Sequence, residues 1–206
     1  GGCPFVSDMA RDLAAVDIAD DLDHGGYVPK TVGAFLAGNL FDGFHTAALA
    51  AANTIRTLMD HPEVTDRLRA EPEKTAAAVS ECLRLEPPVI HLNRVVSADL
   101  AYDGRIIPAG TRVTMMWGAA NRDPDAFPNP DAFDLDRPQQ GSTTFGGGAH
   151  KCIGMVFGQL EIKTIMHRLL RRYRLEPPHP DYRPRYDYAG MPVPIDGMPI
   201  VLRPLR

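Results

Sequence analysis

The 206-residue sequence has few cysteines, few aromatic residues and no strong excess of charge of one sign. Its cysteines, Cys3, Cys82 and Cys152, are too few and too scattered for a disulfide framework or a zinc cluster, which favours a reducing cytoplasm. The net charge of −4, with no basic run that contains aromatic residues, argues against a nucleic-acid partner. No run of eighteen apolar residues occurs, and the first residues lack a signal-peptide layout, so we expect neither a membrane span nor a secretory leader.

The hydrophobic pattern predicts long helices in the first half of the chain and loops in the second, where most of the nineteen prolines lie. Residues 29–60 have apolar side chains around most of the helix and end at His61-Pro62, so we expect one long helix that is buried on several sides. Further helices are expected over residues 62–70, 72–86 and 153–172.

Short strands are expected between residues 94 and 115, with turns at 103–104 and 108–110, and again at 199–203. Residues 121–148 form a meander without periodicity, and a loop of this length is uncommon in a compact domain unless it is functional. With 44% hydrophobic residues, the chain can bury one sizeable core. We therefore expect a mainly α fold with small β-sheets, in a single domain over residues 1–206.

The most informative segment is F-G-G-G-A-H-K-C-I-G at residues 145–154. Its glycines permit positive φ and a close approach of the backbone to a flat ligand. Cys152 directly precedes an apolar helical run, and a thiolate is favoured at the N-terminus of a helix. This arrangement favours a sulfur ligand to an electrophilic centre, with haem iron as the leading candidate. The alternative is a glycine-rich turn around a buried structural cysteine.

This segment resembles the cysteine-ligand loop of the cytochrome P450 family, with the spacing F-x-x-G-x-[RH]-x-C-x-G, and the soluble bacterial type is the expected relative. The resemblance implies that Cys152 is the axial thiolate of haem b and that Phe145 packs beside its sulfur. It also implies that Gly148 and Gly154 permit the turn and that His150 reaches a haem propionate. The implied fold has a long central helix, an E-x-x-R helix, short strands, a meander, and the cysteine-ligand loop with its helix.

Glu81 and Arg84 lie at i and i+3 of a predicted helix, so their side chains share a face. Alone, such a pair is usually an exposed ion pair of little consequence. Here it resembles the family's E-x-x-R motif, which implies a structural role. The resemblance implies that the pair is locked to the meander through Arg137, so that the cysteine loop is held in place.

Arg94, at the start of the first predicted strand, corresponds to a family position that binds a haem propionate. A planar guanidinium suits a carboxylate through two parallel hydrogen bonds. A solvated arginine at a strand edge is the alternative. His91 is either a second propionate contact or a polar loop residue, and the loop interpretation is favoured.

Residues 41–47, F-D-G-F-H-T-A, resemble the family's oxygen-activation motif, [AG]-G-x-[DE]-T. The resemblance implies that the Thr46 hydroxyl holds dioxygen and a proton-delivering water, beside a helix that deforms at Gly43. The chain departs from the motif in two places, because His45 replaces the acid and Asp42 replaces a small residue. Asp42 and Thr46 lie at i and i+4, so we hypothesise that Asp42, His45 or both relay protons. The alternatives are a satisfied polar histidine and an aspartate that only bends the helix.

The resemblance implies a haem-thiolate monooxygenase that inserts one oxygen atom of O2 into a small organic substrate. Its electrons would come from NAD(P)H through a ferredoxin reductase and a ferredoxin, drawn to a basic patch of Lys151, Arg122 and Arg137. The alternatives are a haem-thiolate protein with non-hydroxylating or peroxide-driven chemistry, and a truncated, non-catalytic haem-binding or interaction module.

The resemblance covers only the second half of the family's usual length, which leaves the apolar face of the long helix uncovered. Because a large exposed apolar face aggregates or recruits a partner, the missing N-terminal half or another chain is an expected partner. Most substrate contacts would then lie outside this chain. The expected remainder of the pocket wall is Phe41, Phe44, Val89, Ile90, Leu92 and residues 191–193.

Overall fold

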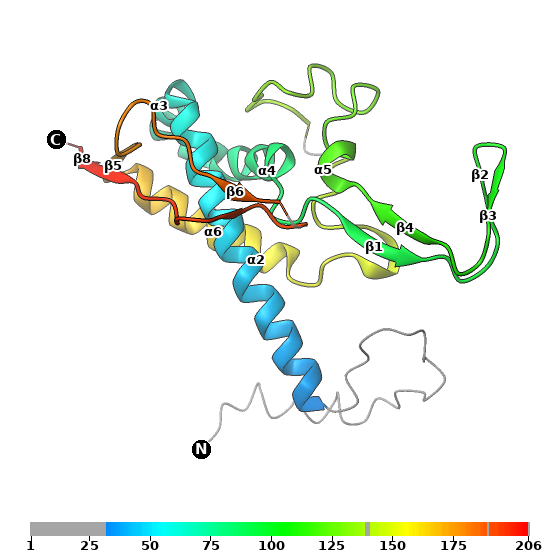
Figure 1. The fold of residues 1–206 in the computed structure, drawn as a ribbon. Coiled ribbons are helices and arrows are strands. Elements are labelled where there is room, and N and C mark those ends of the chain that lie inside the picture. The colour runs from blue at the N-terminus through cyan, green and yellow to red at the C-terminus, as the bar shows by residue number, and fades with distance from the viewer. Residues whose placement is uncertain (1–31, 139–140, 189, 206) are drawn as a thin grey trace. The chain divides into compact units, whose positions relative to one another are not determined.

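The computed structural model describes residues 32–138, 141–188 and 190–205 (Figure 1). The chain divides into two units, residues 1–45 and 46–206. The long helix α2 (Val32–Asp60) runs across this division. It ends at Asp60, as predicted, whereas its expected first residues, 29–31, lie outside the described part. Among the described residues, no helix combines the length and the apolar character that crossing a bilayer requires.

The burial of α2 differs between its two parts. Leu49 and Leu58 are buried, as expected for a helix in a core. Leu40 and Phe44, in contrast, are 76% and 79% exposed. The expectation that α2 is buried on several sides is therefore wrong for these two residues. The physical reason is that an apolar pattern identifies a face that can be buried but does not supply the segment that covers it.

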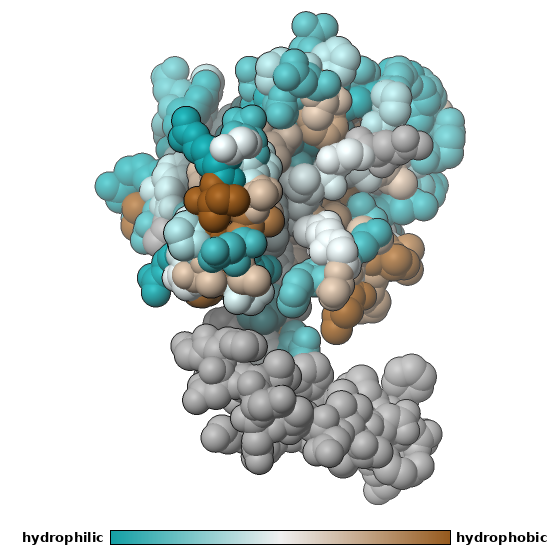
Figure 2. Space-filling model, turned by 90° about the vertical axis from the view of Figure 1, so that its right-hand side faces the viewer, coloured by the Kyte–Doolittle hydropathy of each residue, from teal (hydrophilic) through white to brown (hydrophobic). Residues whose placement is uncertain are grey.

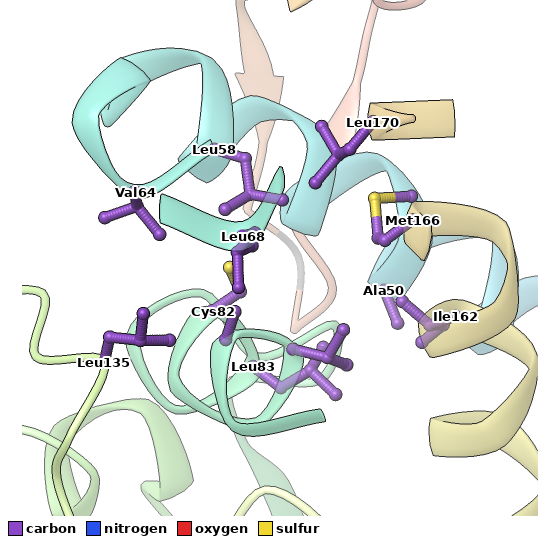
Figure 3. Close-up of a cluster of buried hydrophobic side chains, with 12 residues drawn as sticks. Ala50, Leu58, Val64, Leu68, Cys82, Leu83, Leu135, Ile162, Met166 and Leu170 are labelled. Atoms are coloured by element: carbon purple, nitrogen blue, oxygen red, sulfur yellow. The ribbon is translucent and has the colours of Figure 1, made fainter. Parts of the chain in front are cut away.

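The second part of α2 packs with α3 (Pro62–Ala70), α4 (Thr75–Leu85) and α6 (Met155–Leu170) around one hydrophobic core. Figure 3 shows side chains from these helices, with Leu135 from the meander, pointing toward one another. The cluster comprises Ala50, Leu58, Val64, Leu68, Ala78, Val79, Cys82, Leu83, Leu135, Ile162, Met166 and Leu170. The helix expected over residues 72–86 begins as a 3₁₀ turn, η1 (Pro72–Lys74), in which the Thr75 backbone amide donates to the Pro72 carbonyl. The Thr75 hydroxyl donates to the same carbonyl at 2.7 Å.

The buried residues of helix α6 begin at Ile162. Ile162, Met166 and Leu170 face the core with at most 3% exposure. Val156 and Phe157, in its first half, are 71% and 72% exposed. Hydrophobic residues also stand uncovered beside hydrophilic ones on the face drawn in Figure 2. The first half of α6 therefore presents an apolar surface to solvent.

The described strands pair two by two, and every pair is antiparallel. β1 (Leu92–Val95) pairs with β4 (Arg112–Met115), and between them β2 (Leu100–Tyr102) and β3 (Arg105–Ile107) form a hairpin that extends beyond that pair in Figure 1. Its turn lies at the predicted place, where Asp103 and Gly104 have φ of 48° and 70°. The remaining pairs are β5 (Tyr173–Glu176) with β8 (Val201–Pro204), and β6 (Tyr186–Asp187) with β7 (Val193–Pro194).

A short helix, α5 (Trp117–Ala120), leads into the meander. The described residues between 121 and 147 form turns and bends, as the sequence predicts, and are followed by a 3₁₀ turn, η2 (Gly148–His150). The fold is thus mainly helical with small sheets, in agreement with the expected class. Its core anchors α4 and α6, and the meander and the cysteine loop are built on these two helices.

Candidate functional site

Residues 145–154 fold into a tight loop that ends directly before α6. Gly146 and Gly148 have φ of 65° and 60°, a conformation that glycine adopts without the steric cost paid by other residues. The backbone amide of Cys152 donates to the carbonyl of Phe145 at 2.9 Å, which closes the loop. Gly154 is the N-cap residue of α6. The loop therefore holds Cys152 two residues ahead of the helix cap.

The surroundings of Cys152 fit a haem. Its side chain is exposed, whereas Cys82 is buried in the core, where burial raises the pKa of the thiol. A Cβ built on Gly147 or Gly148 would meet no other atom within 4 Å, so the backbone there is open to a flat ligand. Ile153, next to Cys152, is 88% exposed and offers an apolar contact. An exposed soft sulfur donor beside an apolar side chain is the donor type that haem iron accepts.

A buried ionic network lies behind this loop. Arg84 donates to Glu81 through two hydrogen bonds of 2.8 Å, and Arg137 donates to the same carboxylate at 2.9 Å. The three side chains are only 1–7% exposed. Burial acts to raise the pKa of Glu81, but the hydrogen bonds from Arg84 and Arg137 outweigh it, so the pKa of Glu81 is lowered from its usual value. The carboxylate is therefore held charged between two guanidinium groups.

The network ties α4 to the meander through the backbone of the latter. Arg84 donates to the carbonyls of Asn121 and Pro130, each at 2.7 Å, and Arg137 donates to the carbonyl of Pro128 at 2.8 Å. The amide of Asp134 in turn donates to Glu81 at 3.1 Å. The structure thus brings together Glu81, Arg84 and Arg137, which the resemblance also assigns to one network.

The expected basic patch is not formed as predicted. Arg137 is buried and its guanidinium is occupied by Glu81 and backbone carbonyls, so it is not available to an external partner. Arg122 forms ion pairs with Glu86 and Asp131. Of the three proposed cations, Lys151 is exposed. Arginines in an irregular segment look alike in sequence, and tertiary contacts decide which of them reach solvent.

Sequence reasoning missed a second, uncharged network, centred on Asn121 at the end of α5. The Asn121 amide nitrogen donates to the Thr144 hydroxyl at 2.8 Å, and its carbonyl oxygen accepts from the Thr143 amide at 2.7 Å and hydroxyl at 3.0 Å. The Thr144 hydroxyl donates to the carbonyl of Leu83 at 2.9 Å. Asn121 is fully buried at 0% exposure. The available signal was the run Ser142–Thr144, which directly precedes Phe145.

The residues expected to meet haem propionates lie on the surface. Arg94 is exposed in β1 and donates to the carbonyl of its neighbour Asn93 at 2.8 Å. His150 is exposed at the end of η2. His91 differs, because its Nδ1 atom is buried without a partner among the described residues. Its ring lies against Gly190, where an added Cβ would be 3.4 Å from the His91 Cε1 atom.

Asp42, His45 and Thr46 lie in one uninterrupted helix, α2. Asp42 and Thr46 are one turn apart and so share a face of the helix. Asp42 is exposed, and His45 and Thr46 are half-buried. Their part in proton delivery stays a prediction.

The expected pocket wall is partly assembled. The amide of Ile90 donates to the carbonyl of Gly190 at 2.9 Å, which places Ile90 beside the residue that precedes Met191. Phe44 is exposed on α2, and the side chain of Phe41 lies outside the described part. The function of these residues as a substrate wall stays a prediction.

Comparison with known proteins gives one consistent result. Residues 9–195 match the family model of Cytochrome P450. The chain is 42% identical to Putative cytochrome P450 136 of Mycobacterium tuberculosis, over 78% of this chain and 38% of that protein. It is 39% identical to the Biotin biosynthesis cytochrome P450 of Bacillus subtilis, over 63% of this chain and 33% of that protein.

Solved structures show the same likeness. The crystal structure of P450BioI in complex with an acyl carrier protein ligated to hexadec-9Z-enoic acid superposes with a TM-score of 0.73 at 33% identity, covering 84% of this chain and 43% of that one. CYP109E1 from Bacillus megaterium, in complex with corticosterone, gives a TM-score of 0.74 at 29% identity, covering 83% and 45%. The chain thus spans less than half the length of these relatives.

Proposed function

The chain belongs to the cytochrome P450 family, and from that premise we propose that it forms the cysteine-ligand part of a haem-thiolate monooxygenase that inserts one oxygen atom of O2 into a small organic substrate. The observation that supports the proposal most directly is Cys152. Its thiol is exposed, it stands two residues ahead of the α6 cap, and its loop is closed by the bond to Phe145. Haem b, when bound, supplies the chemistry that activates dioxygen and transfers an oxygen atom.

The side chains of this chain would divide the work around the cofactor. Cys152 would bind the iron as a thiolate, with Phe145 beside the sulfur and with Gly148 and Gly154 allowing the turn. Arg94 and His150, both exposed, would hold the propionates by charge-assisted hydrogen bonds. The Thr46 hydroxyl would hold a proton for delivery. Asp42 or His45 would then resupply that proton to the Thr46 hydroxyl.

Partners follow from the same proposal. We propose an electron donor of the ferredoxin type, fed by a ferredoxin reductase, with exposed Lys151 as one of its contacts. The substrate is proposed to be a small organic molecule, and the setting the cytoplasm. The exposed Leu40 and Phe44 on α2, together with Val156 and Phe157 on α6, favour a covering partner, either the remaining part of a full-length relative or another chain.

The proposal is tested by the reduced, carbon-monoxide difference spectrum of the 206-residue chain reconstituted with haemin. We expect the red-shifted Soret band of thiolate ligation in the wild type and in the control Cys3→Ser, and its loss in Cys152→Ser. A wild-type spectrum without that band would contradict haem-thiolate binding by this chain. A band that survives Cys152→Ser would contradict Cys152 as the ligand.

His45 favours one alternative, a haem-thiolate protein driven by peroxide, because this histidine replaces the acid expected for proton delivery. Peroxide-supported turnover without any reductase would favour this alternative. The relay itself is tested with Asp42→Ala and His45→Ala in a chain that turns over. If neither variant changes oxygen consumption or product yield, the relay is wrong. A spectrum with the thiolate band but without turnover by either route would favour a non-catalytic haem-binding module.

A further inference from the structure

We infer that Asn121 is a positioning residue for Cys152, acting through the segment Ser142–Thr144 that leads into the cysteine loop. The inference deepens the proposed function, since it rests on Cys152 as the ligand. It rests on the hydrogen bonds made by the fully buried side-chain amide of Asn121, and not on a contact between Asn121 and Cys152.

Asn121 joins three parts of the chain. Its backbone carbonyl accepts from Arg84 of α4 at 2.7 Å, and its side chain holds Thr143 and Thr144. The Thr144 hydroxyl returns to α4 by donating to the carbonyl of Leu83 at 2.9 Å. The segment before the loop is therefore bound to α4 along two routes, one through the Asn121 amide and one through the Thr144 hydroxyl.

A short series of backbone contacts leads from Ser142–Thr144 to Cys152. The amide of Gly146 donates to the carbonyl of Thr143 at 2.8 Å. Gly146 is joined by a peptide bond to Phe145, whose carbonyl accepts from the amide of Cys152 at 2.9 Å. A shift of Thr143 would therefore be passed to the turn at Gly146 and to the backbone of Cys152. Buried hydrogen-bonded networks of this kind specify one arrangement when every member is satisfied.

The polarity of the network requires an amide at position 121. A backbone amide can only donate, so the atom facing the Thr143 amide must be the Asn121 carbonyl oxygen. The Thr144 hydroxyl already gives its proton to Leu83, so its oxygen must accept, and the Asn121 nitrogen is the donor. An aspartate has nearly the same shape but lacks that donor. The Asn121→Asp variant therefore removes this hydrogen bond while it leaves the packing nearly unchanged.

The decisive experiment is hydrogen exchange, followed by mass spectrometry, on the apo 206-residue chain and its variants. We expect Asn121→Ala and Asn121→Asp to speed exchange in residues 142–154 by about tenfold or more, because each leaves buried polar groups unsatisfied. Exchange in α4 and in the buried part of α2 should change far less. Equal acceleration everywhere, or none in residues 142–154, would overturn the inference.

Variants of Thr144 keep the test sharp if Asn121 variants fail to fold. Thr144→Val removes the hydroxyl at nearly constant shape and should also open residues 142–154, whereas Thr144→Ser keeps the hydroxyl and should behave as the wild type. Thr164→Val is the matched control, because Thr164 is exposed on α6 and bonds only within its own helix. If Thr144→Ser and Thr144→Val behave alike, the hydroxyl does not position the loop.

A spectroscopic readout connects the network to the ligand. In the haem-loaded chain, Asn121→Asp and Thr144→Val should lower the fraction of the thiolate band relative to the band of neutral ligation, and Thr144→Ser should restore it. An unchanged band ratio in both variants would overturn the link to Cys152. A wild type without a thiolate band would refute the proposed function instead, and the exchange experiment would still decide the role of Asn121 in the loop.

Discussion

Two neighbouring residues of the meander, Asp136 and Arg137, take part in two ionic networks of opposite character. Arg137 points inward and donates to Glu81 beside Arg84, with all three side chains at most 7% exposed. Asp136 points outward and pairs with Arg67 at 2.8 Å and with Lys74 at 2.6 Å. Glu71 closes this outer network into a ring, at 2.9 Å from Arg67 and 3.1 Å from Lys74.

The two networks bind the same segment of chain with different energetic consequences. In the outer ring, water and salt screen each charge, so the loss of one member leaves its partners solvated. In the inner network, the loss of one member leaves a buried charge without compensation. The inner network therefore determines where the meander lies, and the outer ring adds a smaller contribution that depends on salt and pH.

The largest effect is expected from Glu81→Gln. This variant leaves Arg84 and Arg137 buried without their shared carboxylate, which costs about 3–5 kcal/mol in the free energy of unfolding. Urea denaturation followed by circular dichroism measures it. Glu73→Gln is the control, since Glu73 is exposed on η1 and its substitution should change little. Equal denaturation midpoints for the two variants would show that the shared carboxylate of the inner network does not stabilise the fold.

A smaller loss is expected from Arg137→Lys. Lysine keeps the charge but cannot reach Glu81 and the meander carbonyls together with one planar group, so we expect a loss of about 1–3 kcal/mol. The same denaturation experiment measures it, with Arg122→Lys as the partly exposed control. A fully stable Arg137→Lys variant would show that charge alone, without the shape of the guanidinium, is sufficient.

Asp136→Asn should destabilise the chain less than either inner variant, and its effect should depend on salt. The difference from the wild type is expected to shrink as salt rises from about 0.05 to 0.5 M, because the Debye length falls over this range. The deficit of Glu81→Gln should persist over the same range. If both deficits respond equally to salt, the two networks are equally screened and the comparison fails.

The smallest expected difference between the two networks is in the pH dependence of stability. Hydrogen bonds from Arg67 and Lys74 lower the pKa of Asp136 to about 2. The ordinary pKa of an aspartate is about 4, which is the value in the unfolded chain. The ring therefore stabilises the fold fully above about pH 4 and loses this contribution as the pH falls toward 2. The stability difference between the wild type and Asp136→Asn should therefore vanish across this window. A difference that grows on acidification would reverse the assigned sign.

Local patterns were sufficient for much of the fold. The helix over residues 62–70 and the end of α2 at Asp60 lie where the prolines indicate, because proline limits a helix through its own backbone. The turn at Asp103-Gly104 follows from the conformations these residues tolerate. Such features depend on a few adjacent residues and can be read without knowledge of the tertiary structure.

The cysteine loop was accessible to sequence analysis, but the support behind it was only partly so. Glu81, Arg84 and Arg137 could be grouped through a family motif. Asn121 could not, because its partners at positions 143 and 144 are brought to it by the folded meander. The sequence also predicts Arg137 in a basic surface patch, whereas in the structure its pairing with Glu81 buries it. Tertiary contacts thus decide which polar residues of an irregular segment are structural.

Cys152 lies next to the end of helix α6 that is packed less closely against the core. The turns that follow Cys152 expose Val156 and Phe157, whereas the helix from Ile162 onward is packed into the core through Ile162, Met166 and Leu170. On warming, we expect the helix to unwind first from the end next to Cys152, so the surroundings of this thiol would change at the earliest stage of melting. A bound cofactor would then stabilise the weakest turn of the helix. On warming, the cofactor would be released before the core unfolds.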